Sequence, residues 1–112
     1  MLAVCVTTAS FAQNPKIGKE IKATKDYTAG KAILDAQFAN LTDEDKGKAY
    51  DELYKLAKEK ADPTIALITT GKTEGVDYKT LLAALETAYN CEKYASKDAK
   101  KNVEEISPYR TA

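Results

Sequence analysis

Apolar positions recur at helical spacing along much of the chain, and no pair of candidate strands accompanies them. Within one stretch, for example, Gly30, Leu34 and Phe38 follow one another at intervals of four residues and mark a single face. The opposite face carries Lys31 and Asp35, four residues apart, which predicts an ion pair. The predicted helices span residues 17–23, 27–40, 42–62 and 77–94. We therefore predict an all-α fold of antiparallel helical hairpins, with about four helices.

Capping residues and one proline define the predicted helix ends. The Thr42 side chain can accept a hydrogen bond from the amide three residues on, and the Asp45 side chain can accept one from the Thr42 amide, as in a capping box. Asp77 is the predicted cap of the last helix. Pro63 disfavours helical geometry in the residue before it, so the third helix is predicted to end by Asp62.

Two stretches lack a clear helical pattern. Residues 64–76 contain a short apolar run, Ile65–Ile68, which fits either a helical turn or a strand, and two glycines follow it. Because no second strand candidate lies nearby, we predict a loop with at most one helical turn. From residue 96 onward Lys, Asp and Glu predominate and no apolar helical pattern is recognised. Residues 96–112 are therefore predicted to form a flexible, weakly ordered tail.

The first twelve residues are apolar and uncharged, as in the second half of a secretory signal peptide. Ser10 and Ala12 supply the small side chains that signal peptidase requires, so cleavage is predicted after Ala12. A signal peptide normally begins with a basic region, which this segment lacks, and a start codon placed too late would explain its absence. A short buried strand is the alternative interpretation of the segment. The segment is too short to span a membrane, which takes about 20 apolar residues. We expect export to the periplasm or cell envelope, with residues 13–95 forming the helical-hairpin domain.

Charge and composition exclude several classes of function. Lys plus Arg equals Asp plus Glu, 17 against 17, so the chain lacks the positive field with which proteins capture nucleic acid. The chain contains no histidine, the commonest general base and metal ligand. Hydrophobic residues make up 44% of the sequence, enough for a folded core.

Cysteine and tyrosine provide few candidates for chemistry. After the predicted cleavage Cys91 is the single cysteine, and it is either a buried apolar residue or a free thiol. Tyrosines at helical spacing either line the core or stack on a sugar or peptide, and their place in the apolar stripes favours the core. These tyrosines are Tyr50, Tyr54, Tyr78 and Tyr89.

Other short motifs have ordinary structural explanations. Gly71-Lys72-Thr73 resembles the end of a phosphate-binding loop, but the strand and helix of such a loop are missing. The run from Asp43 to Asp45 fits a helix cap better than a calcium site, whose ligands alternate along the chain. Asp51 and Glu105 are predicted to lie on solvated faces. We therefore assign no catalytic, cofactor-binding or metal-binding residues and no cofactor.

Two segments of the chain echo each other. Asp26-Tyr27 and Asp77-Tyr78 each open a predicted helix, and both are followed by similar residues at the same distances. In these residues the chain resembles the tetratricopeptide repeat family, whose second helices open in this way. Gly30 and Leu34 match the small and large apolar positions that the family has next, whereas the second copy has Leu81 at the small position. The copies lie 51 residues apart instead of about 34, which implies an insertion near residues 63–76.

This resemblance implies a non-catalytic protein-interaction scaffold that binds a protein or peptide partner. One alternative is a truncated N-terminal fragment of a longer repeat protein, which has no activity alone and needs downstream repeats or self-association. A remote alternative is a nucleotide-binding protein that acts through Gly71-Lys72-Thr73.

Overall fold

The computed structural model describes residues 14–110, which form helices joined by turns, and it contains no strand in this range. The prediction of an all-α class is thus confirmed. The predicted export signal, residues 1–12, lies outside the described residues. The helices are α2 (Ile17–Thr24), α3 (Tyr27–Gln37), α4 (Asp43–Thr69), α5 (Tyr78–Lys93) and α6 (Ala99–Ile106), with short 3₁₀ helices η1 (Phe38–Asn40) and η2 (Ser107–Tyr109).

Three helices begin at side-chain caps that the sequence displays. The side chains of Asp26 and Thr42 each accept a hydrogen bond from the amide three residues on, at 2.9 and 3.1 Å. Asp77 accepts bonds from the amides of Lys79 and Thr80, at 3.0 and 3.4 Å. Such bonds satisfy amides that the first helical turn leaves without partners. The predicted caps at Thr42 and Asp77 are therefore confirmed.

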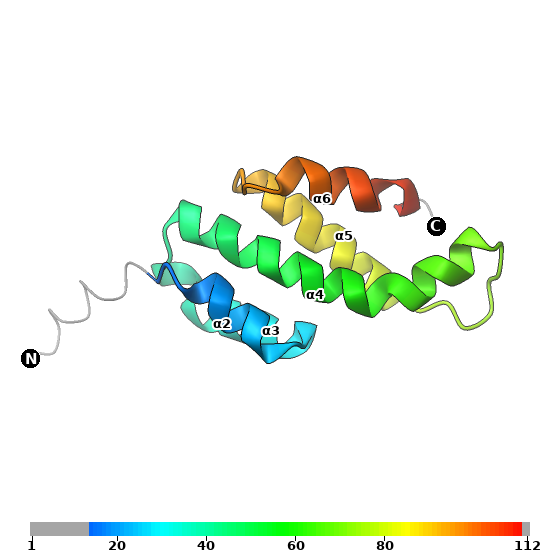
Figure 1. Ribbon diagram of the computed structural model, residues 1–112, viewed down its shortest axis with the longest axis horizontal. Helices are drawn as coiled ribbons and strands as arrows, with labels where there is room; N and C mark the ends of the chain where they lie inside the picture. Colours follow the sequence, from blue (N-terminus) through cyan, green and yellow to red (C-terminus); the bar gives the residue numbers. More distant parts are fainter. Residues whose placement is uncertain (1–13, 111–112) are drawn as a thin grey trace, which may run out of the picture.

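Helix α4 continues through Pro63 to Thr69, whereas the sequence predicted an end by Asp62. A proline inside a helix removes one backbone hydrogen bond and bends the axis, and the last turns of α4 bend in Figure 1. Ile65, two residues after the proline, belongs to the apolar core that α4 shares with α5. Burial of this turn against α5 offsets the lost bond, because tertiary packing provides most helical stability.

The loop between α4 and α5 is shorter than predicted and covers only residues 70–77. Its end is held to α4 by Thr64, whose buried hydroxyl accepts a hydrogen bond from the Asp77 amide at 2.9 Å. The start of α5 is thus attached to the bent part of α4.

The predicted flexible tail is wrong for the described residues, because they include a fifth helix, α6, and η2. Ala99, Asn102 and Ile106 are buried, and α6 packs against α5. Only a narrow stripe of this helix is apolar, and one of its buried positions is an asparagine. Ala99, Val103 and Ile106 do recur at helical spacing, a signal that the prediction missed among the many charged residues of this segment.

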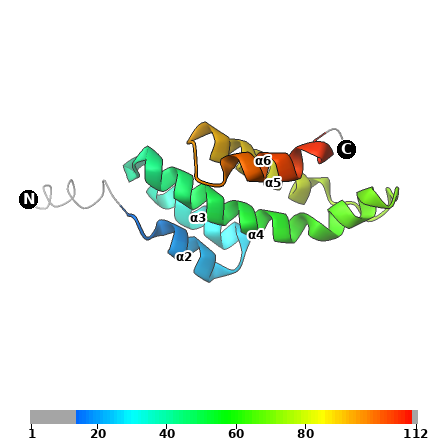
Figure 2. The same ribbon diagram turned by 45° about the horizontal axis from the view of Figure 1, so that its top comes forward.

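Helix α4 crosses the middle of the molecule, with α2 and α3 on one side and α5 and α6 on the other (Figure 1). The rotated view in Figure 2 shows the same division. Each side has its own apolar core. The core on the α2–α3 side consists of Ile17, Ile21, Leu34, Leu41, Ala49 and Leu53. The core on the α5–α6 side consists of Tyr54, Ala57, Ala61, Ile65, Leu81, Ala84, Leu85, Ala88, Cys91, Ala99 and Ile106.

A close approach of three helices occurs at Gly30 of α3. A Cβ atom at this position would lie 2.9 Å from Cγ2 of Ile21 and 3.2 Å from Cδ1 of Leu53. Glycine therefore lets α3 approach both α2 and α4 closely.

None of the helices in residues 14–110 is both long and apolar enough to cross a membrane.

Candidate functional site

A groove lies between α3 and α5, with α4 as its floor. Its main section has a volume of about 470 Å³. This section is lined by Tyr27, Lys31, Leu34 and Asp35 of α3, Tyr50 and Leu53 of α4, and Glu86, Thr87, Tyr89 and Asn90 of α5. We define these residues as the main groove.

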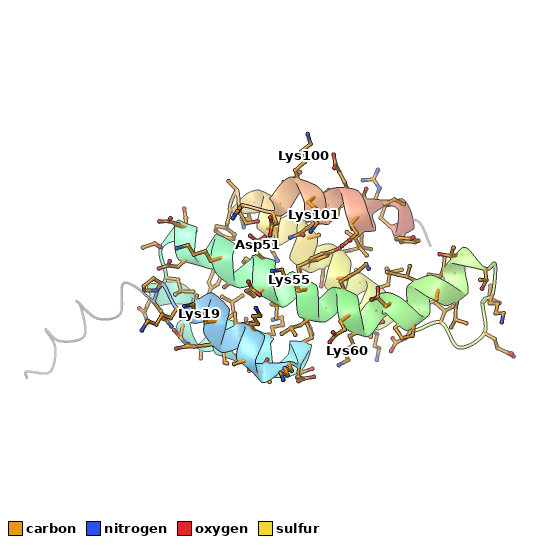
Figure 3. All side chains as sticks on the ribbon, viewed as in Figure 1. Lys19, Asp51, Lys55, Lys60, Lys100 and Lys101 are labelled. Atoms are coloured by element: carbon orange, nitrogen blue, oxygen red, sulfur yellow. The ribbon has the colours of Figure 1, made fainter. Side chains whose placement is uncertain are left out.

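The main groove continues into a second section of about 290 Å³. Tyr27 lines both sections, which places them next to each other along α3 and α5. The second section is lined by the first turns of both flanking helices and by α4, through Tyr27, Thr28, Ala57, Lys60, Asp77, Lys79, Thr80 and Ala83. Helices α3 and α5 therefore run parallel along the groove, with their Asp-capped ends at the same end. Figure 3 labels Lys60, one of the α4 residues that line the second section.

Tyr50 is held in place by an aromatic cluster at the edge of the main groove. Its ring stacks on that of Tyr94 with centroids 5.7 Å apart, and Phe38 packs edge-on against both rings. Lys46 Nζ lies 4.3 Å from the centroid of Phe38, in a cation–π contact. Burial raises the pKa of Tyr50 to about 12, so its hydroxyl is neutral at physiological pH.

Tyr89 contributes a hydroxyl group that has no partner within the described chain. Its oxygen is buried and makes no hydrogen bond to any described residue. Buried polar atoms in proteins nearly always have a partner, and leaving one unpaired costs about 1–3 kcal/mol. Tyr89 also lines the main groove, although its hydroxyl oxygen is itself covered by protein.

Charged side chains occupy both walls of the main groove. Lys31 Nζ lies 2.9 Å from Asp35 Oδ2, which confirms the ion pair expected from their spacing along α3. The hydrogen bond to Asp35 raises the pKa of Lys31, with a smaller contribution from the negative charge of Glu86. Glu86 lines the opposite wall of the groove, and it forms no ion pair within residues 14–110.

The tyrosines predicted to line the core divide into separate environments. Tyr54 is buried, and its hydroxyl donates a hydrogen bond to Glu105 at 2.7 Å. Burial raises the pKa of Tyr54, and the hydrogen bond to Glu105 raises it further by a smaller amount. Tyr78 is 51% exposed, so its predicted core position is wrong. It shares an uncovered face of α5 with Leu82, because the two lie one helical turn apart at the start of the helix.

A second polar cluster lies inside the molecule around Asp51, which is only 8% exposed. Its carboxylate accepts bonds from the Ser96 hydroxyl at 2.6 Å, the Asn102 amide at 3.1 Å and the Asp98 backbone amide at 3.3 Å. Figure 3 labels Asp51 on the side of α4 nearest to α5 and α6. The prediction that Asp51 lies on a solvated face is therefore wrong, since its carboxylate is buried and bonds to a distant helix. Glu105 is exposed, as predicted, although it also accepts the bond from Tyr54.

Cys91 lies next to this cluster and is fully buried, which agrees with the first of its two interpretations, a buried apolar residue. Asn102 Nδ2 lies 3.5 Å from its sulfur. Burial raises the pKa of the thiol to about 12, even though the bond from Asn102 acts in the opposite direction. The neutral, buried thiol is a poor nucleophile, because thiolates carry out the chemistry of cysteine.

Gly71-Lys72-Thr73 does not have the geometry of a phosphate-binding loop. The amide of Gly71 donates to the carbonyl of Ile68, and the amide of Lys72 donates to that of Leu67, each at 2.9 Å. These residues close the C-terminal end of α4, where the helix dipole is negative. A phosphate-binding loop instead presents free amides at the N-terminus of a helix.

The acidic run from Asp43 to Asp45 occupies the first turn of α4, as the cap interpretation predicts. Between residues 14 and 110, no group of three or more His, Cys, Asp or Glu side chains is placed to hold a metal ion.

Comparison with known proteins gives no family for the chain: no family model matches it, and neither a curated protein nor a solved structure is significantly similar.

Of the residues that form the main groove, the sequence highlighted Tyr50 and Tyr89 as possible stacking residues and Lys31 with Asp35 as a helical pair. It did not indicate that α3 and α5 lie side by side. The recurrence of Asp-Tyr at the start of both helices is the one signal that could have indicated this parallel placement.

Proposed function

We propose that the chain is a non-catalytic protein-interaction scaffold that binds a peptide segment of a protein partner in the groove between α3 and α5. The observation that carries the proposal is a tyrosine-walled groove that three helices build together. Its main section, about 470 Å³, falls within the range of about 300–1,000 Å³ that is usual for ligand sites.

The shape and lining of the groove favour a peptide over a compact small molecule. The two sections extend along the parallel helices, and peptides are elongated ligands. Tyrosine is enriched where proteins bind one another, because it combines a large apolar ring with a hydroxyl. Asn90 also lines the groove, and its side-chain amide can exchange hydrogen bonds with a peptide backbone.

A tetratricopeptide-like arrangement of helical hairpins forms part of this proposal. It is supported by the packing of successive helices against each other and by the packing of α2 against α4 as well. On this interpretation α2 with α3 and α4 with α5 are hairpins, and α6 is the first helix of a third. Because residues 1–12 have the pattern of an export signal, we place the scaffold in the periplasm or cell envelope.

One observation favours the alternative that the chain acts only as part of a longer repeat array. Tyr78 and Leu82 are 51% and 54% exposed on one face of α5. Repeat proteins cover such faces with the next repeat. In that case another helix, downstream or from a second copy, packs on this face, and the chain alone has no activity.

The groove is tested by selecting ligands for the full chain from a displayed library of random heptapeptides. The selected peptides are then measured against Asn90→Trp, which places a large ring in the groove. We expect their affinity to fall by about tenfold or more, since the ring occupies the peptide's position. Glu92→Trp is the matched control, because Glu92 is exposed on the same helix and does not line the groove.

Selection of no peptide, or only of peptides that bind Asn90→Trp as well as the unmodified chain, would show that the groove is not a peptide site. Peptides that are instead sensitive to Leu82→Lys would assign binding to the exposed face of α5 and support the repeat-array alternative.

A further inference from the structure

We infer that the main groove binds a basic side chain, arginine or lysine, of the partner peptide; this inference rests on the proposed function of the groove. It concerns the section between Asp35 of α3 and Glu86 of α5.

The charges that line this section favour a cation. Asp35 and Glu86 contribute two carboxylates from opposite walls, and Lys31 contributes one ammonium group. Lys31 already pairs with Asp35 at 2.9 Å. Glu86 has no ion-pair partner in residues 14–110, so one carboxylate is available to a ligand.

The aromatic lining favours the same kind of ligand. Tyr27, Tyr50 and Tyr89 line the section together, and the faces of aromatic rings attract ammonium and guanidinium groups. The hydroxyl oxygen of Tyr89 is buried, so Tyr89 contributes its ring to this lining. Arginine fits best, because its planar guanidinium stacks on rings and pairs with a carboxylate at the same time.

An acidic side chain is a poor match for this position. It would meet two carboxylates, and it could pair with Lys31 only by competing with Asp35. The adjoining section of the groove carries Lys60 and Lys79, which repel a basic side chain. Asp77, the acidic residue of that section, already caps α5. A basic side chain is therefore directed to the section that contains Glu86.

The test is a nuclear magnetic resonance titration of the ¹⁵N-labelled full chain with acetyl-Gly-Arg-Gly-amide and, separately, acetyl-Gly-Glu-Gly-amide. We expect the arginine peptide to shift the amide signals of Asp35, Glu86 and Asn90, and the glutamate peptide to leave them in place. Glu86→Gln should weaken binding of the arginine peptide by about fivefold or more, because the unpaired carboxylate is removed.

Two further variants make the test specific. Glu92→Gln removes an exposed carboxylate from the same helix, outside the groove, and should leave binding unchanged. Glu86→Lys reverses the charge and should abolish arginine binding while creating binding of the glutamate peptide. Because Glu86 is exposed and makes no ion pair in the described chain, both Glu86 variants should keep the helical circular dichroism spectrum.

The possible failures have different meanings. If library peptides bind in the groove but the arginine peptide does not, or if Glu86→Gln binds it unchanged, the basic-side-chain inference is wrong and the groove proposal stands. If the glutamate peptide shifts the groove signals more strongly, the assigned charge preference is overturned. If no peptide is sensitive to Asn90→Trp, the groove proposal itself fails.

Discussion

At the scale of single residues, the turn between α5 and α6 contains an unusual backbone conformation. Ala95 has φ of 50°, in the left-handed region, where an L-residue other than glycine loses about 1–2 kcal/mol. The amide of Ser96 donates to the carbonyl of Cys91 at 2.9 Å and so closes the end of α5. The same turn brings the Ser96 hydroxyl to Asp51. The strain at Ala95 is thus offset by the contacts that the turn makes possible.

Replacing Ala95 with glycine should raise the free energy of unfolding by about 1 kcal/mol, because glycine adopts this conformation without steric cost. Ala32→Gly is the control, since Ala32 is exposed in the middle of α3 and glycine there should cost about 1 kcal/mol. Urea denaturation measures both variants. Equal destabilisation by the two substitutions would contradict a left-handed turn at Ala95.

At the scale of elements, a buried carboxylate attaches α6 to the rest of the molecule. Asp51 of α4 accepts hydrogen bonds from Ser96 in the turn and from Asn102 in α6. The apolar contribution of α6 comes from a narrow stripe in which Ala99 and Ile106 are buried. The hydrogen bonds to Asp51 act together with this stripe to fix where α6 lies.

Asp51→Ala should lower the free energy of unfolding by about 3 kcal/mol, because it leaves buried donors without an acceptor. Asp62→Ala provides a matched change in the same helix. Asp62 is exposed and pairs with Lys58, so this substitution should cost less than about 1 kcal/mol. Thermal unfolding followed by circular dichroism compares the two. Similar small losses would mean that Asp51 does not anchor α6.

At the scale of the whole molecule, two apolar cores share α4, and the groove lies at their junction. Tyr27 and Tyr50 pack against both cores and also line the main groove. A peptide in the groove would therefore touch both halves. The α2–α3 core contains fewer buried residues than the α5–α6 core, so we expect the α2–α3 hairpin to open first.

Native-state hydrogen exchange should resolve these two halves as separate units. Ile17→Ala and Ile106→Ala each remove a fully buried side chain, one from each core, at a cost of about 3 kcal/mol. The first should reduce protection mainly in α2 and α3, and the second mainly in α6 and α5. A uniform loss of protection in either variant would instead indicate one cooperative unit.

The sequence alone determined the helical class and most of the helix starts, because the signals for these act over short distances. A cap such as Thr42 bonds within its own first turn, and the apolar stripe of α3 depends only on helical geometry. The pair Lys31–Asp35 and the buried position of Cys91 could be predicted for the same reason.

Only the tertiary structure decided the path of α4 beyond Pro63, the packing of α6 against α5 and the position of the groove. Thr64 and Asp77 are 13 residues apart, and Asp51 and Asn102 are 51 residues apart. No local pattern records such partners, so a proline appears as a helix end and a buried aspartate as a surface residue. The groove depends on how two helices pack on a third, and that geometry arises only when both cores form.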